Sequence, residues 1–309
     1  MTGITDTAVS RSDVAVAGGS LAVFELSDSA PAREAPAVLA VHGVTATSRA
    51  WRAVARALAD RARLIAPDLR GRGASRTLPE PYGIRVHVAD LTAVLDHFDL
   101  ERTVLVGHSL GADLVARVAV DHPERVAAVV LIDGGLTIPG SENVDPQEFA
   151  DALLGPALAR LRMTFPSREA YHAWWRAHPA LIGGQVDDQD LVVYADHDLV
   201  GEAPELHPTA LEAAVRADAG ELPERANAAG QLQVPATLLC APRGLQNGPD
   251  PMQPLALAQA WAAEDPQRRQ ARLVEDVNHY TITLSARGAT AVAGAIVEAL
   301  AATGVQSRS

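Results

Sequence analysis

The sequence has only one cysteine, Cys240, among 309 residues, so no disulfide can form within the chain. It has no uninterrupted apolar run near the length of about 20 residues that a membrane-spanning helix needs. The N-terminus also lacks the basic stretch followed by an apolar segment that is typical of a secretory signal peptide. These absences predict a cytoplasmic protein that does not have a membrane as its partner.

An excess of positive charge is also missing. The 26 basic residues face 38 acidic ones, which gives a formal net charge of −12. A strongly acidic chain is repelled by phosphate backbones, so we do not expect nucleic acid as a partner. Hydrophobic residues make up 48% of the chain and charged residues 21%, as in an ordinary globular protein with one large core.

Two kinds of apolar pattern predict the strands. Residues 13–17 and 20–26 alternate apolar and polar residues, and Gly18-Gly19 between them favours a β-hairpin. Almost continuous apolar runs are typical of parallel strands that helices cover on both faces. Such runs occupy residues 37–41, 63–67, 103–107, 126–132 and 235–240, and the sheet pattern resumes at residues 270–277.

Helical spacing alternates with these runs. Apolar residues recur at helical intervals over residues 49–60, 88–98 and 111–123. Alternation of strands and helices with short connections predicts an α/β fold, here a mostly parallel eight-stranded sheet flanked by helices.

The alternation stops after residue 134. Up to about residue 230 the chain has helical stretches broken by proline and glycine, and no run typical of a buried strand. We therefore predict a core formed by residues 1–134 and 231–309, with an inserted helical cap at 135–230. Several acidic residues of this cap are expected on its solvated surface, namely Glu142, Asp145, Asp187, Asp188 and Asp190.

Ser109 stands between two glycines, Gly107 and Gly111, where the strand 103–107 meets the helix 111–123. A sharp turn of this kind exposes the serine hydroxyl beside the N-terminus of a helix, where amides and the helix dipole favour a developing oxyanion. The glycines are needed because side chains would collide in so tight a turn. The pattern Gly-x-Ser-x-Gly, with a strand before it and a helix after it, predicts a nucleophilic serine.

This turn and three other segments resemble the α/β-hydrolase-fold family. Residues 39–51 resemble the family's His-Gly loop, residues 66–75 its Asp-x-Arg-Gly-x-Gly turn, and residues 274–282 its late strand followed by a histidine. The four landmarks occur in the family's order, and the resemblance extends from about residue 20 to residue 300. It implies an α/β-hydrolase fold and a catalytic triad in the order serine, acid, histidine.

The resemblance implies His279 as the triad base, because it follows the last strand. For the acid, Gly244 occupies the place usual in the family, and the next acid along the loop is Asp250. A minority of the family carries the acid just before the cap, where Asp133 stands. We favour Asp133, although an aspartate before two glycines is also a common turn former and Asp250 stays an alternative.

The resemblance further implies that the backbone amides of Val44 and Leu110 form an oxyanion hole. The remaining histidines of the motifs are expected to be structural. His108 is expected to point away from the serine, and His42 to pack under the oxyanion loop. His122 and His178 each precede a proline and are expected to be exposed at helix ends.

These residues predict a serine hydrolase that acts on a small ester or lactone without a metal or another cofactor, through an acyl-enzyme. A thioesterase, a C–C bond hydrolase and a perhydrolase are alternatives on the same triad, and a non-catalytic ligand receptor is an alternative of another class. Trp174 and Trp175 in the cap are candidates for binding an apolar or aromatic substrate, unless they anchor the cap to the core.

Overall fold

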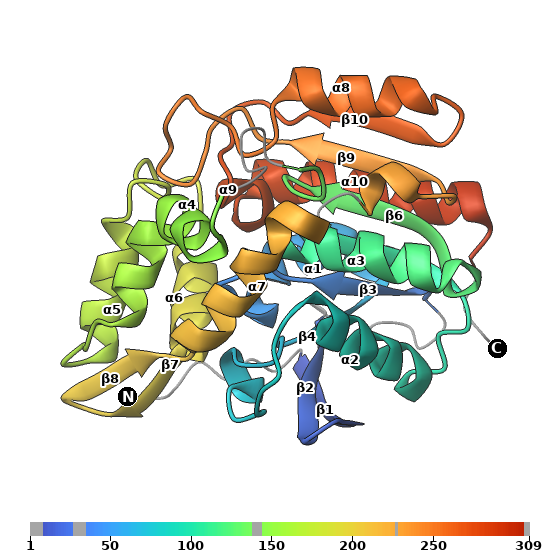
Figure 1. The fold of residues 1–309 in the computed structure, drawn as a ribbon. Helices are drawn as coiled ribbons and strands as arrows, with labels where there is room; N and C mark the ends of the chain where they lie inside the picture. The colour runs from blue at the N-terminus through green and yellow to red at the C-terminus, as the bar shows by residue number, and fades with distance from the viewer. Residues whose placement is uncertain (1–8, 27–34, 138–143, 226–227, 306–309) are drawn as a thin grey trace.

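The computed structural model describes residues 9–26, 35–137, 144–225 and 228–305. Its centre is an eight-stranded sheet, whose parallel strands run across the view in Figure 1. The strands are β1 (Val9–Val16), β2 (Gly19–Leu26), β3 (Ala37–Val41), β4 (Arg63–Pro67), β5 (Thr103–His108), β6 (Val126–Ile132), β9 (Ala236–Cys240) and β10 (Arg269–Leu273).

The sheet has the order β1-β2-β4-β3-β5-β6-β9-β10. The hairpin β1–β2 and the pair β2–β4 are antiparallel, whereas all the other neighbours are parallel. The predicted α/β class, the hairpin and the mostly parallel sheet are therefore confirmed. The last strand is shorter than predicted because the chain leaves the sheet after Leu273, on the way to His279.

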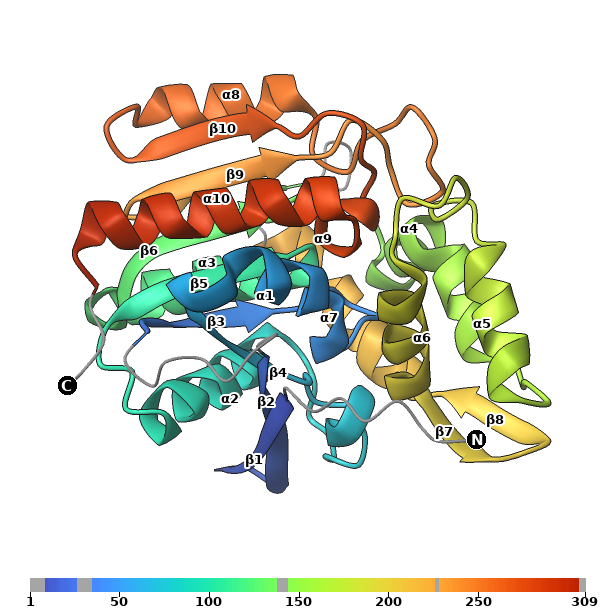
Figure 2. The same cartoon turned by 180° about the vertical axis from the view of Figure 1, so that it is seen from behind.

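Helices cover both faces of the sheet, as Figures 1 and 2 show from opposite sides. One face packs against α2 (Ile84–His97), α3 (Leu110–Asp121) and α8 (Leu255–Glu264). The other face packs against α1 (Arg52–Leu58) and α10 (Ala286–Thr303). Within β5, Leu105 packs on the first side and Val104 and Val106 on the second. Burial of both faces explains why the strand sequences are continuously apolar.

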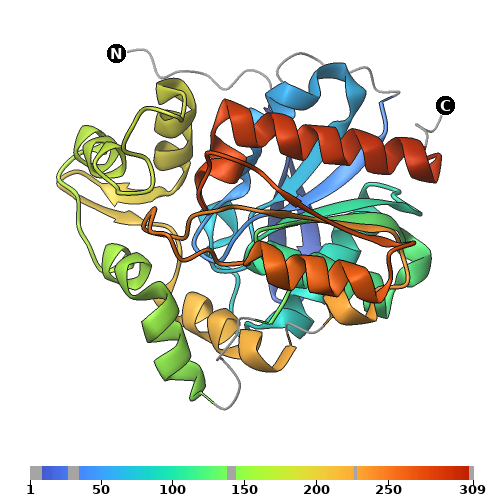
Figure 3. The same ribbon diagram turned by 90° about the horizontal axis from the view of Figure 1, so that it is seen from above.

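An insert between β6 and β9 lies beyond one end of the sheet (Figures 1 and 3). Its helices are α4 (Pro146–Leu161), α5 (Arg168–Arg176), α6 (Asp188–His197) and α7 (Glu212–Arg225). It also contains a hairpin of β7 (Leu199–Glu202) and β8 (Glu205–Pro208), which the sequence analysis missed. These strands have four residues each and include charged residues, so they form no apolar run. The division of the chain into core and cap domains stays a prediction.

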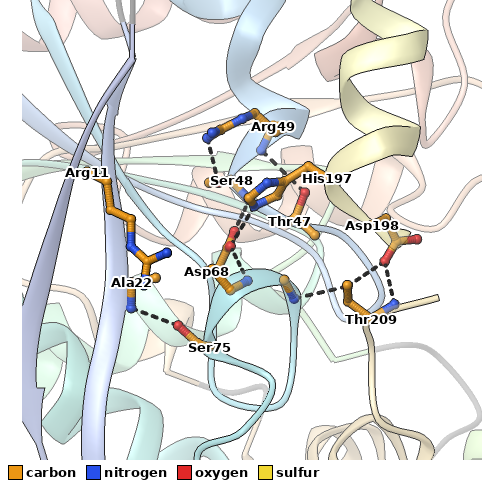
Figure 4. A network of polar contacts seen from close by, with 12 residues as sticks. Arg11, Ala22, Thr47, Ser48, Arg49, Asp68, Ser75, His197, Asp198 and Thr209 are labelled. Atoms are coloured by element: carbon orange, nitrogen blue, oxygen red, sulfur yellow. Dashed lines mark hydrogen bonds and ion pairs between the residues drawn. The ribbon is translucent and has the colours of Figure 1, made fainter. Parts of the chain in front are cut away.

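One contact between insert and core is made by Asp68, which follows β4 (Figure 4). Its carboxylate accepts hydrogen bonds from the amides of Ser48 (2.7 Å) and Ala74 (2.8 Å), and from Nε2 of His197 at 2.7 Å. Burial by itself would raise the pKa of Asp68, but His197 and these donors hold it well below its usual range. The end of α6 is thereby fixed to the turn after β4.

Asp218 of α7 makes a second contact of this kind. Its fully buried carboxylate lies 2.7 Å from a guanidinium nitrogen of Arg72 and 2.9 Å from Nε2 of His87, and it accepts the amide of Gly83 at 2.8 Å. Together these partners offset the cost of burying the charge.

The acidic residues of the insert do not share one environment. Asp190 was predicted to be solvated, but this was wrong: it is 5% exposed and pairs with Arg52 and Arg56 of α1. The sequence did not indicate which side of α6 meets α1. Asp145 and Asp187 are exposed N-caps, and Asp188 is exposed beside Arg176. Glu142 lies outside the described residues.

In the described part of the chain, no helix combines the length and the apolar character that crossing a bilayer would require.

Removing the Asp218 carboxylate should destabilise the protein strongly. Asp218→Ala leaves the Arg72 guanidinium buried without its counter-ion, and loss of one partner of a buried pair costs about 3–5 kcal/mol. The free energy of unfolding in denaturant measures this cost. The matched control is Asp151→Ala, which removes an exposed partner of Arg216 and should cost less than about 1 kcal/mol. Equal losses in the two variants would contradict a special role of the buried carboxylate.

Candidate active site

Ser109 occupies the turn between β5 and α3 with a left-handed backbone, φ 54°. It is partly exposed, whereas His108 and Leu110 on either side are buried. A Cβ atom on Gly107 would overlap the carbonyl of Gly111, and one on Gly111 would overlap the carbonyl of Val41. The two glycines are therefore required by the close approach of β3, β5 and α3.

A third glycine, Gly134, completes this packing, and the sequence analysis did not identify it. A Cβ atom there would lie 2.5 Å from the carbonyl oxygen of Ser109 and 2.8 Å from its Cα. The amide of Ser109 also donates to the carbonyl of Ile132 at 2.9 Å. The segment after β6 therefore supports the turn from one side, and the pair Gly134-Gly135 was the only signal of it in the sequence.

Asp133, the first residue after β6, reaches His279 from below the cavity. Its Oδ2 lies 2.7 Å from Nδ1 of His279, and its Oδ1 accepts the amide of Ala241 at 3.1 Å. Both side chains are buried, at 1% and 4% exposure. Because Nδ1 of His279 faces the carboxylate, Nε2 is the ring nitrogen that remains for other partners.

The backbone of His279 is fixed on both sides. Its amide donates to the carbonyl of Arg243 at 3.0 Å, and its carbonyl accepts from Nε2 of His108 at 2.9 Å. His108 therefore has a structural contact, but it is not remote from the site, because its ring centroid lies 4.7 Å from that of His279. Burial, followed by the nearby His279, keeps the pKa of His108 well below its usual value, so His108 is neutral at pH 7.

The alternative acid lies elsewhere. Asp250 is exposed and is not part of the lining of the cavity that Ser109 and His279 share. A side chain at Gly244 would overlap the carbonyl oxygen of Asp250, so the loop backbone occupies the space where an acid at position 244 would begin. The structure thus brings Asp133, and not Asp250, to the imidazole of His279.

Val44 and Leu110, the candidates for an oxyanion hole, line the same cavity as Ser109. The carbonyl of Gly43 faces Nδ1 of His42 at 2.8 Å, and Nε2 of His42 accepts the amide of Leu69 at 3.0 Å. In a trans peptide the amide of Val44 therefore points away from His42. Leu110 begins α3, so its amide has no partner within the helix.

Burial lowers the pKa of His42 to about 4, although nearby Asp68 opposes this shift. A neutral ring with the proton on Nδ1 can donate to Gly43 and accept from Leu69 at once. His42 thus positions the peptide that carries the Val44 amide, in agreement with its expected place under the loop.

The rest of the cavity is lined mainly by apolar side chains from the insert and from the loop after β9. They include Leu136, Phe149, Leu153, Leu154, Leu245 and Met252.

Trp174 and Trp175 do not line this cavity, so the structure does not place them at the predicted substrate site. Trp175 is 1% exposed and packs in the apolar centre of the insert, with its ring 5.3 Å from that of Tyr194. Trp174 is only partly buried and packs against the same cluster. The spacing of apolar residues in α5 indicated that the helix has an apolar side. It did not indicate whether this side would pack within the insert or line the substrate cavity.

The predicted exposure of His178 was wrong. It is 8% exposed and packs against Trp175 and Tyr280, with ring centroids at 5.5 and 5.2 Å. His122, at the end of α3, has a side chain that is 37% exposed, as expected for a helix end.

Comparison with known proteins identifies the fold. Residues 36–174 match the family model described as alpha/beta hydrolase fold. E-2-(acetamidomethylene)succinate hydrolase has a similar crystal structure, with a TM-score of 0.76 at 21% identity over 95% of this chain and 99% of that one. The chain therefore has the α/β-hydrolase fold.

Two curated relatives are similar over part of the chain. Lipase LipV of Mycobacterium tuberculosis is 34% identical over 171 residues, which are 54% of this chain and 61% of the lipase. Epoxide hydrolase B of the same organism is 33% identical over 145 residues, which are 43% of this chain and 41% of that protein. The matched segments thus span less than two thirds of either relative.

The buried His42 should make the protein sensitive to acid. Its pKa is about 4 in the folded chain against 6.5 in the unfolded chain, so the unfolded state binds the extra proton between these values. The stability that neutral His42 contributes is present above pH 6.5 and is lost as the pH falls toward 4. The loss is at most about 3 kcal/mol.

Denaturant unfolding at a series of pH values measures this effect. His42→Gln, whose amide can donate and accept but does not titrate, should show a shallower fall over the same range. An equally steep fall in the variant would assign the acid sensitivity to other groups.

Proposed function

We propose that the protein is a serine hydrolase that cleaves a carboxylic ester or a lactone through an acyl-enzyme. The observation that carries this proposal is the 2.7 Å contact between Asp133 and His279, beside the cavity that both share with Ser109. A serine on a strand–turn–helix, a histidine and a buried carboxylate are the groups that nucleophilic acyl transfer requires.

In the proposed reaction, Ser109 Oγ attacks the carbonyl carbon of the substrate while Nε2 of His279 takes the hydroxyl proton. Asp133 holds the ring with Nε2 toward the cavity and stabilises the imidazolium that forms. The imidazolium then returns the proton to the leaving alkoxide, and the acyl group stays on Ser109. Water, activated by the same histidine, releases the acid and restores the serine.

Ser109 and His279 line the same cavity, and catalytic hydrogen bonds between such groups often tighten only when substrate binds. The amides of Val44 and Leu110 are the proposed donors to the oxyanion of the tetrahedral intermediate. His42 fixes one of these amides, and the other stands at the N-terminus of α3, so neither has to reorganise during the reaction.

The identity of the residue at position 109 helps to choose between ester hydrolysis and epoxide opening, which are both activities named for relatives. Epoxide hydrolases of this fold use a carboxylate there, which attacks the epoxide carbon directly. Ser109 needs a base to become a nucleophile, and this chain has His279 beside a carboxylate. The serine therefore favours acyl transfer over epoxide opening.

The lining of the cavity supports an apolar substrate. The acyl or alcohol part would contact side chains such as Leu136, Phe149 and Met252. None of the described lining residues is an arginine, and the sequence contains no lysine, so an anionic substrate would meet no counter-ion there.

Replacing the nucleophile is the first test. Ser109→Ala should lower kcat on para-nitrophenyl esters by about 10⁴–10⁶, as for loss of a triad serine elsewhere. A fluorophosphonate probe should label the wild type and fail to label the variant. The circular dichroism spectrum and melting temperature should stay close to those of the wild type, because the hydroxyl makes no buried contact that folding needs.

The outcomes separate the alternatives. A folded Ser109→Ala protein that turns over esters normally would end the serine-hydrolase proposal. A wild type that takes up the probe but hydrolyses only thioesters, or only carbon–carbon bonds beside a carbonyl, would keep the triad and change the substrate class. A wild type that binds ligands without labelling or turnover would be a receptor on this fold.

The second test concerns the acid. Asp133→Asn keeps the size of the side chain but removes the charge that stabilises the imidazolium, and should lower kcat by about 10⁴. The matched control is Asp250→Asn, which changes an exposed aspartate of the loop after β9 and should leave kcat within about twofold of the wild type. The reverse result would move the acid to Asp250.

A further inference from the structure

Asp113 is a buried acid in the proposed substrate cavity that the triad does not use. It stands in the first turn of α3, four residues after Ser109, and lines the same cavity. It is 6% exposed.

The protein provides hydrogen-bond partners for only part of the Asp113 carboxyl group. The backbone of Gly135 and its own backbone hydrogen-bond to it, but Oδ1 is buried and has no partner. Burial raises the pKa of Asp113 to about 8, so the group is a neutral acid at pH 7. Because the amide donors need an acceptor, the proton belongs on the unpartnered Oδ1.

Gln253 carries a second orphaned oxygen. Gln253, in the loop after β9, is 2% exposed and donates Nε2 to the carbonyl of Leu136 at 3.1 Å. This bond assigns the orientation of the amide, and it leaves Oε1 buried without a partner. Asp113 and Gln253 are thus bonded to consecutive residues, Gly135 and Leu136, and both line the cavity.

The two oxygens are not bonded to each other, and both residues line the cavity. A buried polar atom left without a partner costs about 1–3 kcal/mol. Such a cost at two residues that line one cavity is explained if a ligand group bonds to both.

We propose that Asp113 and Gln253 form a polar subsite that binds a hydroxyl group on the otherwise apolar substrate. The hydroxyl oxygen accepts from the acid proton of Asp113, and the hydroxyl proton is donated to Oε1 of Gln253. The inference rests on the proposed function, and it narrows the substrate class to hydroxylated esters or lactones. Asp113 and Gln253 act on selectivity and take no part in the acyl transfer itself.

The test compares para-nitrophenyl hexanoate with its monohydroxylated derivatives, a set of positional isomers with the hydroxyl group at successive carbons of the chain. The hydroxyl preference is kcat/KM for the best isomer divided by kcat/KM for hexanoate. Two hydrogen bonds that are absent with hexanoate predict a preference of about tenfold or more in the wild type.

Three variants locate the subsite. Asp113→Leu, similar in size but apolar, should lower the preference to about one, and Gln253→Met should lower it too. Asp113→Asn has both a donor and an acceptor, like the neutral acid, and should keep most of the preference. Asp121→Leu, at the exposed end of the same helix, is the matched control and should leave the preference unchanged.

The possible failures are distinguishable. Hydrolysis of hexanoate without any hydroxyl preference, or a preference that survives both Asp113→Leu and Gln253→Met, overturns the subsite but leaves the serine-hydrolase proposal intact. Absence of both ester hydrolysis and probe labelling in the wild type overturns the proposed function instead.

Amino-substituted hexanoates test the charge of the ligand. If they react faster than the hydroxylated isomers and Asp113→Asn removes the advantage, the subsite takes a cation on an ionised Asp113, and the hydroxyl assignment is wrong. If Asp113→Leu does not fold, Gln253→Met still tests the hydroxyl preference, and Asp113→Asn still tests whether the charge of residue 113 matters.

Discussion

The close approach of backbone around Ser109 is the constraint on which the candidate site depends. The ends of β3 and β5, the start of α3 and the segment after β6 meet there with no room for a Cβ atom at Gly107, Gly111 or Gly134. This contact holds the serine in a left-handed conformation and leaves it partly exposed. It also brings Asp133, one residue before Gly134, under the imidazole of His279.

Buried carboxylates connect the insert to this core. Asp68, Asp190 and Asp218 each pair with a basic side chain across the boundary, and all three aspartates are buried. The sequence contains no lysine, so every permanent cation in these contacts is an arginine guanidinium. Its planar set of donors suits buried pairs better than a strongly hydrated ammonium does. The same contacts place the apolar side of the insert over the serine and so form the cavity wall.

The sequence allowed much of the fold to be predicted, because the signals were local. Continuous apolar runs marked the parallel strands, the Gly18-Gly19 pair marked the hairpin, and Gly-x-Ser-x-Gly marked the turn at Ser109. The insert was harder. Its strands β7 and β8 are too short for a pattern, and the burial of Asp190, Trp175 and His178 depends on which helix faces which neighbour.

What the sequence by itself determined was the order of strands and helices and the crowded turn, since periodicity and glycine spacing act within a few residues. Only the tertiary structure decided which acid contacts His279. Asp133 and Asp250 lie on two separate loops, and the positions of these loops in the fold determine which carboxylate reaches the imidazole. It also decided that Asp113 and Gln253, 140 positions apart, approach one segment of chain. Contacts at such separations are fixed by the packing of whole elements, which no local pattern records.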